Sequence, residues 1–271
     1  MIRDEVYKFF SDYIFQHSGM VYSANDYYRL DARINELVKI FSMNNVDEVY
    51  DMYKKNVTPD MKAVLINIST NNETYFFRDV KPFSVLTKLV LPEILAKVPS
   101  GSINIWSAAS STGQEAYSML MGVQNSAIAS SFSRLSLFGS DISTDALNKA
   151  RKGNYNGLDV QRGLPVALLM KYFTQNPDET WQINKDLLTK VRFAEFNLLK
   201  DSYPKENYHI IFCRNVLIYQ EKDNKTAILK NLYSALKPGG YLFLGNGESL
   251  IGIDSKFERV TLDGYTIYKK N

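Results

Sequence analysis

Beyond Gly101, short apolar runs alternate with amphipathic segments of helical length, and this alternation constrains the fold more than any other feature of the chain. The apolar runs occupy residues 103–107, 135–140, 191–196, 209–213, 241–245 and 265–269. The helical segments between them include residues 115–123, 144–152 and 224–236. Because strands that alternate with helices usually form doubly wound sheets, the pattern predicts an α/β fold with a mostly parallel sheet.

Two departures from the alternation are expected. Two short runs near the end, residues 257–262 and 264–268, meet at Asp263-Gly264, a pair typical of tight hairpin turns, so we expect an antiparallel edge there. Residues 153–190 carry several glycines and prolines and no clean strand–helix unit. We expect a small β-subdomain over about 155–190, with a helix near 164–172 and a short β element near 180–183.

The first 75 residues have a helical pattern. Apolar side chains recur at helical spacing in two stretches, Val6, Phe9, Phe10, Tyr13, Ile14 and then Leu30, Ile34, Leu37, Val38, Phe41. Thr58 followed by Pro59 predicts the start of a further helix through Ile68, because proline suits the first helical turn. The sequence therefore predicts a helical domain over residues 1–75 and an α/β domain over residues 76–271.

The composition limits the classes of function. Across 271 residues the net charge is only +3, which gives no general reason to expect nucleic-acid binding. One cysteine, Cys213, excludes an intrachain disulfide, and two histidines make a zinc site unexpected. The first ten residues lack the apolar run of a signal peptide, and no apolar stretch approaches the ~20 residues of a spanning helix. We expect a cytoplasmic protein without membrane insertion or metal, and nothing demands more than a monomer.

Two segments place polar groups where an open α/β sheet binds ligands. Small residues from Ala108 to Gly113 link the first apolar run to a helix, and such turns let backbone approach a ligand and its anionic groups closely. These residues do not form the Gly-x-Gly-x-x-Gly fingerprint of dinucleotide-binding proteins. The alternative is a turn of small residues that only packs the strand against the helix. Asp141 ends the second run, where an acid can accept hydrogen bonds from a ribose diol. The alternative for Asp141 is helix capping.

Three further segments carry candidate groups. Asn197 follows a strand and could read an adenine edge, although turn chemistry is the commoner use of asparagine there. Arg214 ends a buried strand, where it needs an anionic or planar partner, and a structural ion pair is the alternative. Arg78 follows two phenylalanines at the junction of the two domains. The alternative is junction packing, with Arg78 paired to Asp79 or its neighbours.

Taken together and in order, these segments resemble the CheR family of chemoreceptor methyltransferases over nearly the whole chain. The matching stretches are residues 70–78, which end in Phe-Phe-Arg, Ser111-Thr-Gly-Gln-Glu-Ala-Tyr-Ser118, Asp141-Ile-Ser143 with Ala150 to Tyr155, Phe212-Cys-Arg-Asn-Val-Leu-Ile-Tyr219, and Leu236 to Ser249. The resemblance implies a Rossmann-like S-adenosylmethionine methyltransferase sheet behind an all-α N-terminal domain.

The resemblance also implies the site. It assigns S-adenosylmethionine, and its product S-adenosylhomocysteine, to Asn72, Thr74, Arg78, Ala109, Glu115, Asp141, Asn197, Leu198, Arg214 and Asn215. It directs Arg78, Arg214 and Tyr219 toward the substrate carboxylate. The methyl acceptor would be a glutamate on the cytoplasmic helical region of chemoreceptors, esterified for chemotactic adaptation.

One departure from the family concerns its β-subdomain. Members that dock the C-terminal pentapeptide of a receptor carry a longer, glycine-bearing loop, whereas no glycine lies between Phe173 and Lys185 here. We therefore expect an enzyme that does not need the pentapeptide. Two rival readings remain: a methyltransferase for small molecules or nucleic acid, and a sensor that binds S-adenosylmethionine without transferring methyl groups.

Overall fold

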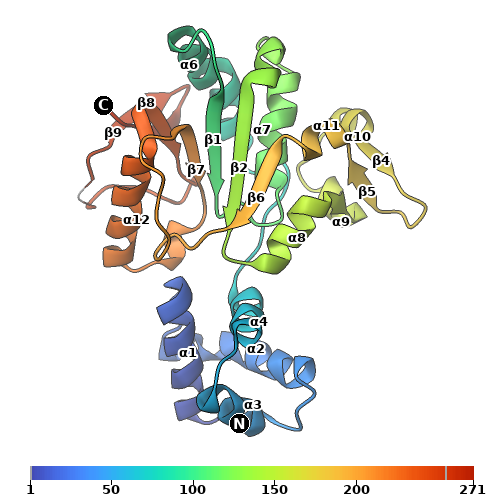
Figure 1. Ribbon diagram of the computed structural model, residues 1–271, viewed down its shortest axis with the longest axis vertical. Coiled ribbons are helices and arrows are strands. Elements are labelled where there is room, and N and C mark those ends of the chain that lie inside the picture. The colour runs from blue at the N-terminus through green and yellow to red at the C-terminus, as the bar shows by residue number, and fades with distance from the viewer. Residues whose placement is uncertain (1, 254) are drawn as a thin grey trace.

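The computed structural model describes residues 2–253 and 255–271, and shows a helical N-terminal region beneath an α/β region (Figure 1). The helical region consists of α1 (Asp4–Ser18), a short 3-10 turn (Ala24–Asp26), α2 (Tyr27–Ile40), α3 (Val46–Lys55) and α4 (Pro59–Ser69). The side-chain oxygens of Asn45 and Thr58 accept hydrogen bonds from the first turns of α3 and α4. The two helices expected from the apolar spacing are confirmed as α1 and α2, and the helix expected after Thr58-Pro59 is confirmed as α4.

The helical region has its own hydrophobic core. One side of each helix contributes, with Phe10 and Ile14 from α1, Leu30 and Ile34 from α2, and Tyr53 from α3 all buried. Gly19 ends α1 at φ 72°, a left-handed conformation that glycine adopts at little cost.

The α/β region is built on a seven-stranded sheet of order β6-β2-β1-β7-β8-β10-β9. Its strands are β1 (Ile103–Ala108), β2 (Leu135–Asp141), β6 (Val191–Glu195), β7 (Tyr208–Cys213), β8 (Leu236–Phe243), β9 (Glu258–Leu262) and β10 (Tyr265–Lys269). The first five pair in parallel and β9 and β10 are antiparallel. The doubly wound sheet and its hairpin edge are thus confirmed.

Helices cover both faces of this sheet because both faces are apolar. Alternate residues of β1 enter different clusters: Ile103 and Ile105 pack with α7 (Gln114–Gln124), whereas Trp106 and Ala108 pack with α12 (Lys222–Ala235). The first cluster is also covered by α5 (Lys81–Val85), a π-helical turn (Leu86–Val90), α6 (Leu91–Lys97) and α8 (Thr144–Lys152). Two 3-10 turns, Ala129–Arg134 and Leu217–Tyr219, complete the connections.

The small β-subdomain expected over 155–190 is present as an excursion between β2 and β6 (Figure 1). It consists of β3 (Asn154–Tyr155), α9 (Gly157–Gln161), α10 (Val166–Tyr172), β4 (Phe173–Gln175), β5 (Trp181–Ile183) and α11 (Lys185–Leu188). Its three strands form a separate antiparallel sheet of order β3-β5-β4.

The expected bounds of one strand were wrong. The apolar run predicted a strand over 241–245, but β8 begins at Leu236, which pairs with Tyr208. A register shift between Tyr208 and Ile210 accommodates the intervening glycines. Gly240 passes so close to the neighbouring strand that a Cβ there would lie 2.9 Å from the main-chain oxygen of His209. Lys237 to Gly240 carry no apolar signal, so the pattern could not reveal their extended pairing.

Candidate functional site

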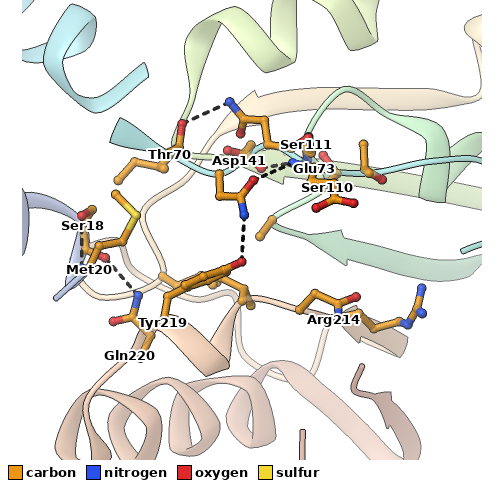
Figure 2. Close-up of a pocket in the computed structure, with 18 of the residues that line it drawn as sticks. Ser18, Met20, Thr70, Glu73, Ser110, Ser111, Asp141, Arg214, Tyr219 and Gln220 are labelled. Atoms are coloured by element: carbon orange, nitrogen blue, oxygen red, sulfur yellow. Dashed lines mark hydrogen bonds between the residues drawn. The ribbon is translucent and has the colours of Figure 1, made fainter. Parts of the chain in front are cut away.

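A pocket lies where β1, β2, β6 and β7 end, next to the helical region. Its lining comes from Ile228 of α12 and from six stretches of chain that are distant in sequence: residues 18–20, 70–78, 109–115, 141–142, 196–199 and 214–220. Every residue that the sequence assigned to the site lines it, namely Asn72, Thr74, Arg78, Ala109, Glu115, Asp141, Asn197, Leu198, Arg214, Asn215 and Tyr219. Figure 2 shows Ser18 and Met20 on one side of this pocket and Arg214 on the other, with Tyr219 between them.

Asp141 organises the turn after β1. Its carboxylate accepts hydrogen bonds from the backbone N–H groups of Ser111, at 2.8 Å, and Ser143, at 2.9 Å. Ala109 and Ser111 hold φ values of 55° and 50°, left-handed conformations that cost energy for residues with a Cβ. Burial raises the pKa of Asp141 above its ordinary value, although these backbone amides favour the ionised form. Asp141 therefore fixes the turn and still lines the pocket.

Arg214 and Glu115 form the centre of a buried ion-pair network. Nη1 of Arg214 donates to Glu115 at 3.0 Å and Nη2 donates to Asp79 at 2.5 Å. The second oxygen of Glu115 accepts from the hydroxyl of Ser107 at 2.7 Å. The Arg214 side chain is 1% exposed, so removal of either acid would leave a poorly compensated buried charge. The structural ion pair considered for Arg214 is present.

Two buried polar atoms at the pocket have no protein partner within the described residues. They are Nε of Arg214 and the hydroxyl oxygen of Ser110, whose residues are 6% and 2% exposed. An unpaired buried polar group is costly, so each calls for a ligand or a water. S-adenosylmethionine offers a carboxylate, an ammonium and ribose hydroxyls, which suit an arginine N–H, the acids Glu115 and Asp141, and small hydroxyls. The residues present fit this cofactor.

Arg78 is held differently from Arg214. Its Nη1 donates to the main-chain oxygen of Glu73 at 2.8 Å, and its guanidinium lies 5.6 Å from the ring centroid of Tyr75. Among the described residues no carboxylate lies within ion-pair distance of Arg78, since Asp79 pairs with Arg214 instead. The ion pair of the packing alternative, between Arg78 and Asp79 or its neighbours, is therefore not formed among the described residues, although Phe76 and Phe77 do pack in the core. Arg78 keeps hydrogen-bond donors for an anion in the pocket.

Tyr219, Asn71 and Asn72 connect two loops of the α/β region to the linker between α4 and α5, residues 70–80. The hydroxyl of Tyr219 accepts a hydrogen bond from the side chain of Asn71 at 3.0 Å, drawn as the dashed line at Tyr219 in Figure 2. The proton of this hydroxyl is therefore free to donate to another group. The main-chain oxygen of Asn72 accepts from the hydroxyl of Ser111 at 2.8 Å. The linker is thereby fastened both to the turn after β1 and to the loop after β7.

The C-terminus of α1 closes one side of the pocket. Asn197 donates to the main-chain oxygen of His17 at 2.6 Å, and Gln220 donates to that of Ser18 at 3.1 Å. The amide oxygen of Asn197 accepts from the N–H of Leu199, so its side chain also serves the turn chemistry considered as the alternative. These contacts join residues that are 180 and 202 positions apart in the sequence, and the apolar pattern carried no signal of them.

Glu248 supports the loop that carries Arg214, Asn215 and Tyr219. Its carboxylate accepts from the backbone N–H groups of residues 215, 216, 217, 218 and 245, at 2.7 to 3.3 Å. Asn215 holds φ at 60°, which places its N–H toward this acid. Among the residues that were not assigned from the sequence are Asp79, Ser107, Ser110 and Glu248. A signal existed for two of them, because Ser110 lies in the turn of small residues 108–113 and Glu248 lies in the matched stretch 236–249.

Two other features are absent from the part of the chain that the structure describes. In the described ranges, 2–253 and 255–271, no helix has the length and apolar character needed to cross a membrane. Over the same part of the chain, no cluster of three or more histidine, cysteine, aspartate or glutamate side chains has the geometry of a metal site.

Comparison with known proteins identifies the family. A family model described as "CheR methyltransferase, SAM binding domain" matches residues 72–266. The chain is 35% identical over 271 residues to the chemotaxis protein methyltransferase of Vibrio parahaemolyticus, covering 99% of this chain and 98% of that protein. It is 33% identical over 255 residues to chemotaxis protein methyltransferase Cher2 of Pseudomonas putida, covering 93% and 92%. Identity to the chemotaxis protein methyltransferase of Escherichia coli is 30% over 271 residues, covering 98% and 91%.

The matched model is that of an S-adenosylmethionine-binding domain, and its span contains all the pocket segments except the C-terminus of α1 and residues 70–71. The relatives match along nearly their whole length, so the helical region is shared as well. The chain thus belongs to the CheR methyltransferase family and is an S-adenosylmethionine-dependent methyltransferase of chemotaxis.

Proposed function

We propose that this enzyme transfers the methyl group of S-adenosylmethionine to glutamate side chains in the cytoplasmic helical region of chemoreceptors, forming methyl esters. The observation that carries the proposal is Arg78, whose guanidinium lines the cofactor pocket without a carboxylate partner among the described residues. A cation placed in this way favours an anionic acceptor over a neutral amine or hydroxyl. A glutamate carboxylate meets this requirement.

The chemistry needs little from the protein beyond alignment. Bound S-adenosylmethionine supplies a methyl group on a sulfonium, which is a good leaving group. A glutamate carboxylate is already ionised at neutral pH, so the acceptor needs no general base. Arg78 would hold one carboxylate oxygen and leave the other free to attack, and Tyr219 would add a hydrogen bond from its free proton.

The two arginines then have separate roles. The two terminal nitrogens of Arg214 donate to Asp79 and Glu115, so we assign Arg214 to positioning Glu115. Its unpaired Nε would contact the cofactor. Arg78 would face the acceptor. Asn72, Thr74, Ala109, Glu115, Asp141, Asn197, Leu198 and Asn215 complete the proposed cofactor set.

We further propose that the enzyme works without the receptor pentapeptide. Its β4–β5 hairpin turns within residues 176–180, closed by a hydrogen bond from the N–H of Asn176 to the oxygen of Thr180. Glu179 takes the left-handed conformation of this turn at φ 64°, where glycine is the usual residue. A short hairpin without glycine supports an enzyme that lacks the longer docking loop.

Three assignments accompany this function. We propose that residues 1–75 form a helical domain and 76–271 the catalytic domain, which is supported by the separate hydrophobic core of the helices. We also propose a cytoplasmic monomer that acts on receptors without nucleic acid. Sedimentation of the purified enzyme tests the monomer.

The deciding experiment is transfer of labelled methyl from S-adenosylmethionine to receptor-containing membranes, followed by alkali. Label released as methanol from receptor-sized bands would establish a carboxyl ester. Alkali-stable label would point to a nitrogen acceptor and overturn the proposed substrate. A synthetic peptide with the receptor's C-terminal five residues, titrated against the enzyme, tests the pentapeptide: binding at micromolar strength would refute independence.

A further inference from the structure

Arg162 lies just after α9, in the small β-subdomain, and the sequence analysis did not assign it to the site. Its Nη2 donates to the carboxylate of Glu73 at 2.8 Å. Its guanidinium also stacks on the ring of Tyr75, 4.2 Å from the centroid. Both partners belong to the linker that carries Arg78.

Arg162 and Arg78 share these two partners. Tyr75 contacts both guanidinium groups, with Arg78 at 5.6 Å from the ring centroid. Glu73 also contacts both arginines, but through different atoms: its main-chain oxygen accepts from Arg78 and its carboxylate accepts from Arg162. The two acids nearest in sequence to Arg78 are therefore both paired with other cations, Asp79 with Arg214 and Glu73 with Arg162.

The loop that carries Arg162 is held firmly against this linker. Gly163 has φ 79°, and a Cβ there would collide with the main-chain oxygen of Phe76. Phe76 is fully buried and packs edge-on against Tyr155 of β3. Because the backbone at Gly163 is packed this closely against the linker, the position of the Arg162 Cα is fixed. Forming the ion pair with Glu73 therefore costs little additional conformational entropy.

We propose that Arg162 is a positioning residue that keeps the Glu73 carboxylate away from Arg78, so that Arg78 stays available to the acceptor carboxylate. The inference rests on the proposed role of Arg78. Without Arg162, the carboxylate of Glu73 would have no cation partner. It would lie near the guanidinium of Arg78, which already contacts the main-chain oxygen of Glu73. An anion tethered in this way has a high effective concentration and would compete with the receptor glutamate.

The test compares Arg162→Ala, Arg162→Ala with Glu73→Gln, and Arg259→Ala as a matched control. Arg259 is an exposed arginine on β9, at the far edge of the sheet from β6. Initial rates of base-labile methyl transfer are measured against receptor concentration. Calorimetry gives the affinity for S-adenosylhomocysteine, and circular dichroism checks the fold.

Arg162→Ala is expected to raise the receptor KM about tenfold, with cofactor affinity changed less than about twofold. The added Glu73→Gln should restore KM to within about threefold of wild type, because it removes the competing charge. A crystal structure of Arg162→Ala should show the Glu73 carboxylate on the Arg78 guanidinium. Arg259→Ala should behave as wild type.

Two results would overturn the inference while leaving the proposed function intact. One is ester formation with an unaltered KM in Arg162→Ala. The other is a double variant as impaired as Arg162→Ala, which would mean that Arg162 contacts the receptor directly. A wild-type enzyme that forms no base-labile ester would instead overturn the proposed function, and this inference with it.

Discussion

Replacing Glu248 by glutamine tests how the catalytic loop is held. The carboxylate of Glu248 accepts five backbone N–H groups: Oε2 accepts those of Asn215 and Gly245, both at 2.7 Å, and Oε1 accepts three others. Glutamine has almost the same shape but replaces one acceptor oxygen by an NH2 group. That group can only donate, so it would face backbone donors.

The size of the effect follows from the hydrogen bonds lost. A hydrogen bond to a charged group contributes about 1.5–3 kcal/mol, and the two at 2.7 Å can no longer form if Oε2 becomes the nitrogen. Because Glu248 is half-buried, water can replace part of this loss. We expect Glu248→Gln to lower the free energy of unfolding by about 3 kcal/mol. The loop would also loosen around Arg214 and Tyr219, lowering cofactor affinity about tenfold.

Urea denaturation of the ligand-free protein measures the first effect, as a lower midpoint at unchanged m value. Calorimetry with S-adenosylhomocysteine measures the second. Glu258→Gln is the matched control, because Glu258 is exposed on the edge strand β9 and should change stability by less than about 0.5 kcal/mol. A loss under about 1 kcal/mol in Glu248→Gln, with unchanged affinity, would refute the claim that this carboxylate anchors the loop.

Three further predictions concern other groups. Arg78→Ala should lower kcat/KM for methyl transfer about 100-fold, because it removes a charged hydrogen-bond donor. Tyr219→Phe should lower it only about tenfold, because the donor removed is neutral. Initial rates of methyl transfer measure both effects. Arg214→Lys should cost about 3 kcal/mol in thermal unfolding, because a lysine at this buried position cannot pair with both of the partly buried acids. Burial favours the neutral form of Glu93, but hydrogen bonds, the largest from Lys97, outweigh it and lower its pKa to about 2. The carboxylate therefore stabilises the fold above about pH 4.5, and this contribution is lost as the pH falls toward 2. Glu93→Gln should cost roughly 1 kcal/mol at pH 7, after allowance for solvent screening, and progressively less below pH 4.5 in pH-dependent unfolding.

The sequence by itself determined the fold class and predicted many of the residues that line the pocket. Strands and helices each have a characteristic local spacing of apolar side chains, and this spacing can be read from the sequence. For this reason β1, β2 and α8 lie almost where the pattern predicted them. Asp263-Gly264 predicted the antiparallel hairpin because few other dipeptides accept so tight a turn. Asp141 was placed at a strand end, and strand ends converge in a parallel sheet, so its arrival in the pocket needed no long-range information.

Only the tertiary structure decided what each charged group in the pocket does. Arg78 and Arg214 look alike in sequence, yet Arg214 is neutralised by Glu115 and Asp79, which lie 99 and 135 residues away, and Arg78 keeps free donors. Such pairings depend on which segments the sheet order brings together, and no local pattern records them. The contacts of Arg162 with the linker have the same origin: 89 residues separate Arg162 from Glu73, and packing of the β-subdomain against the linker unites them.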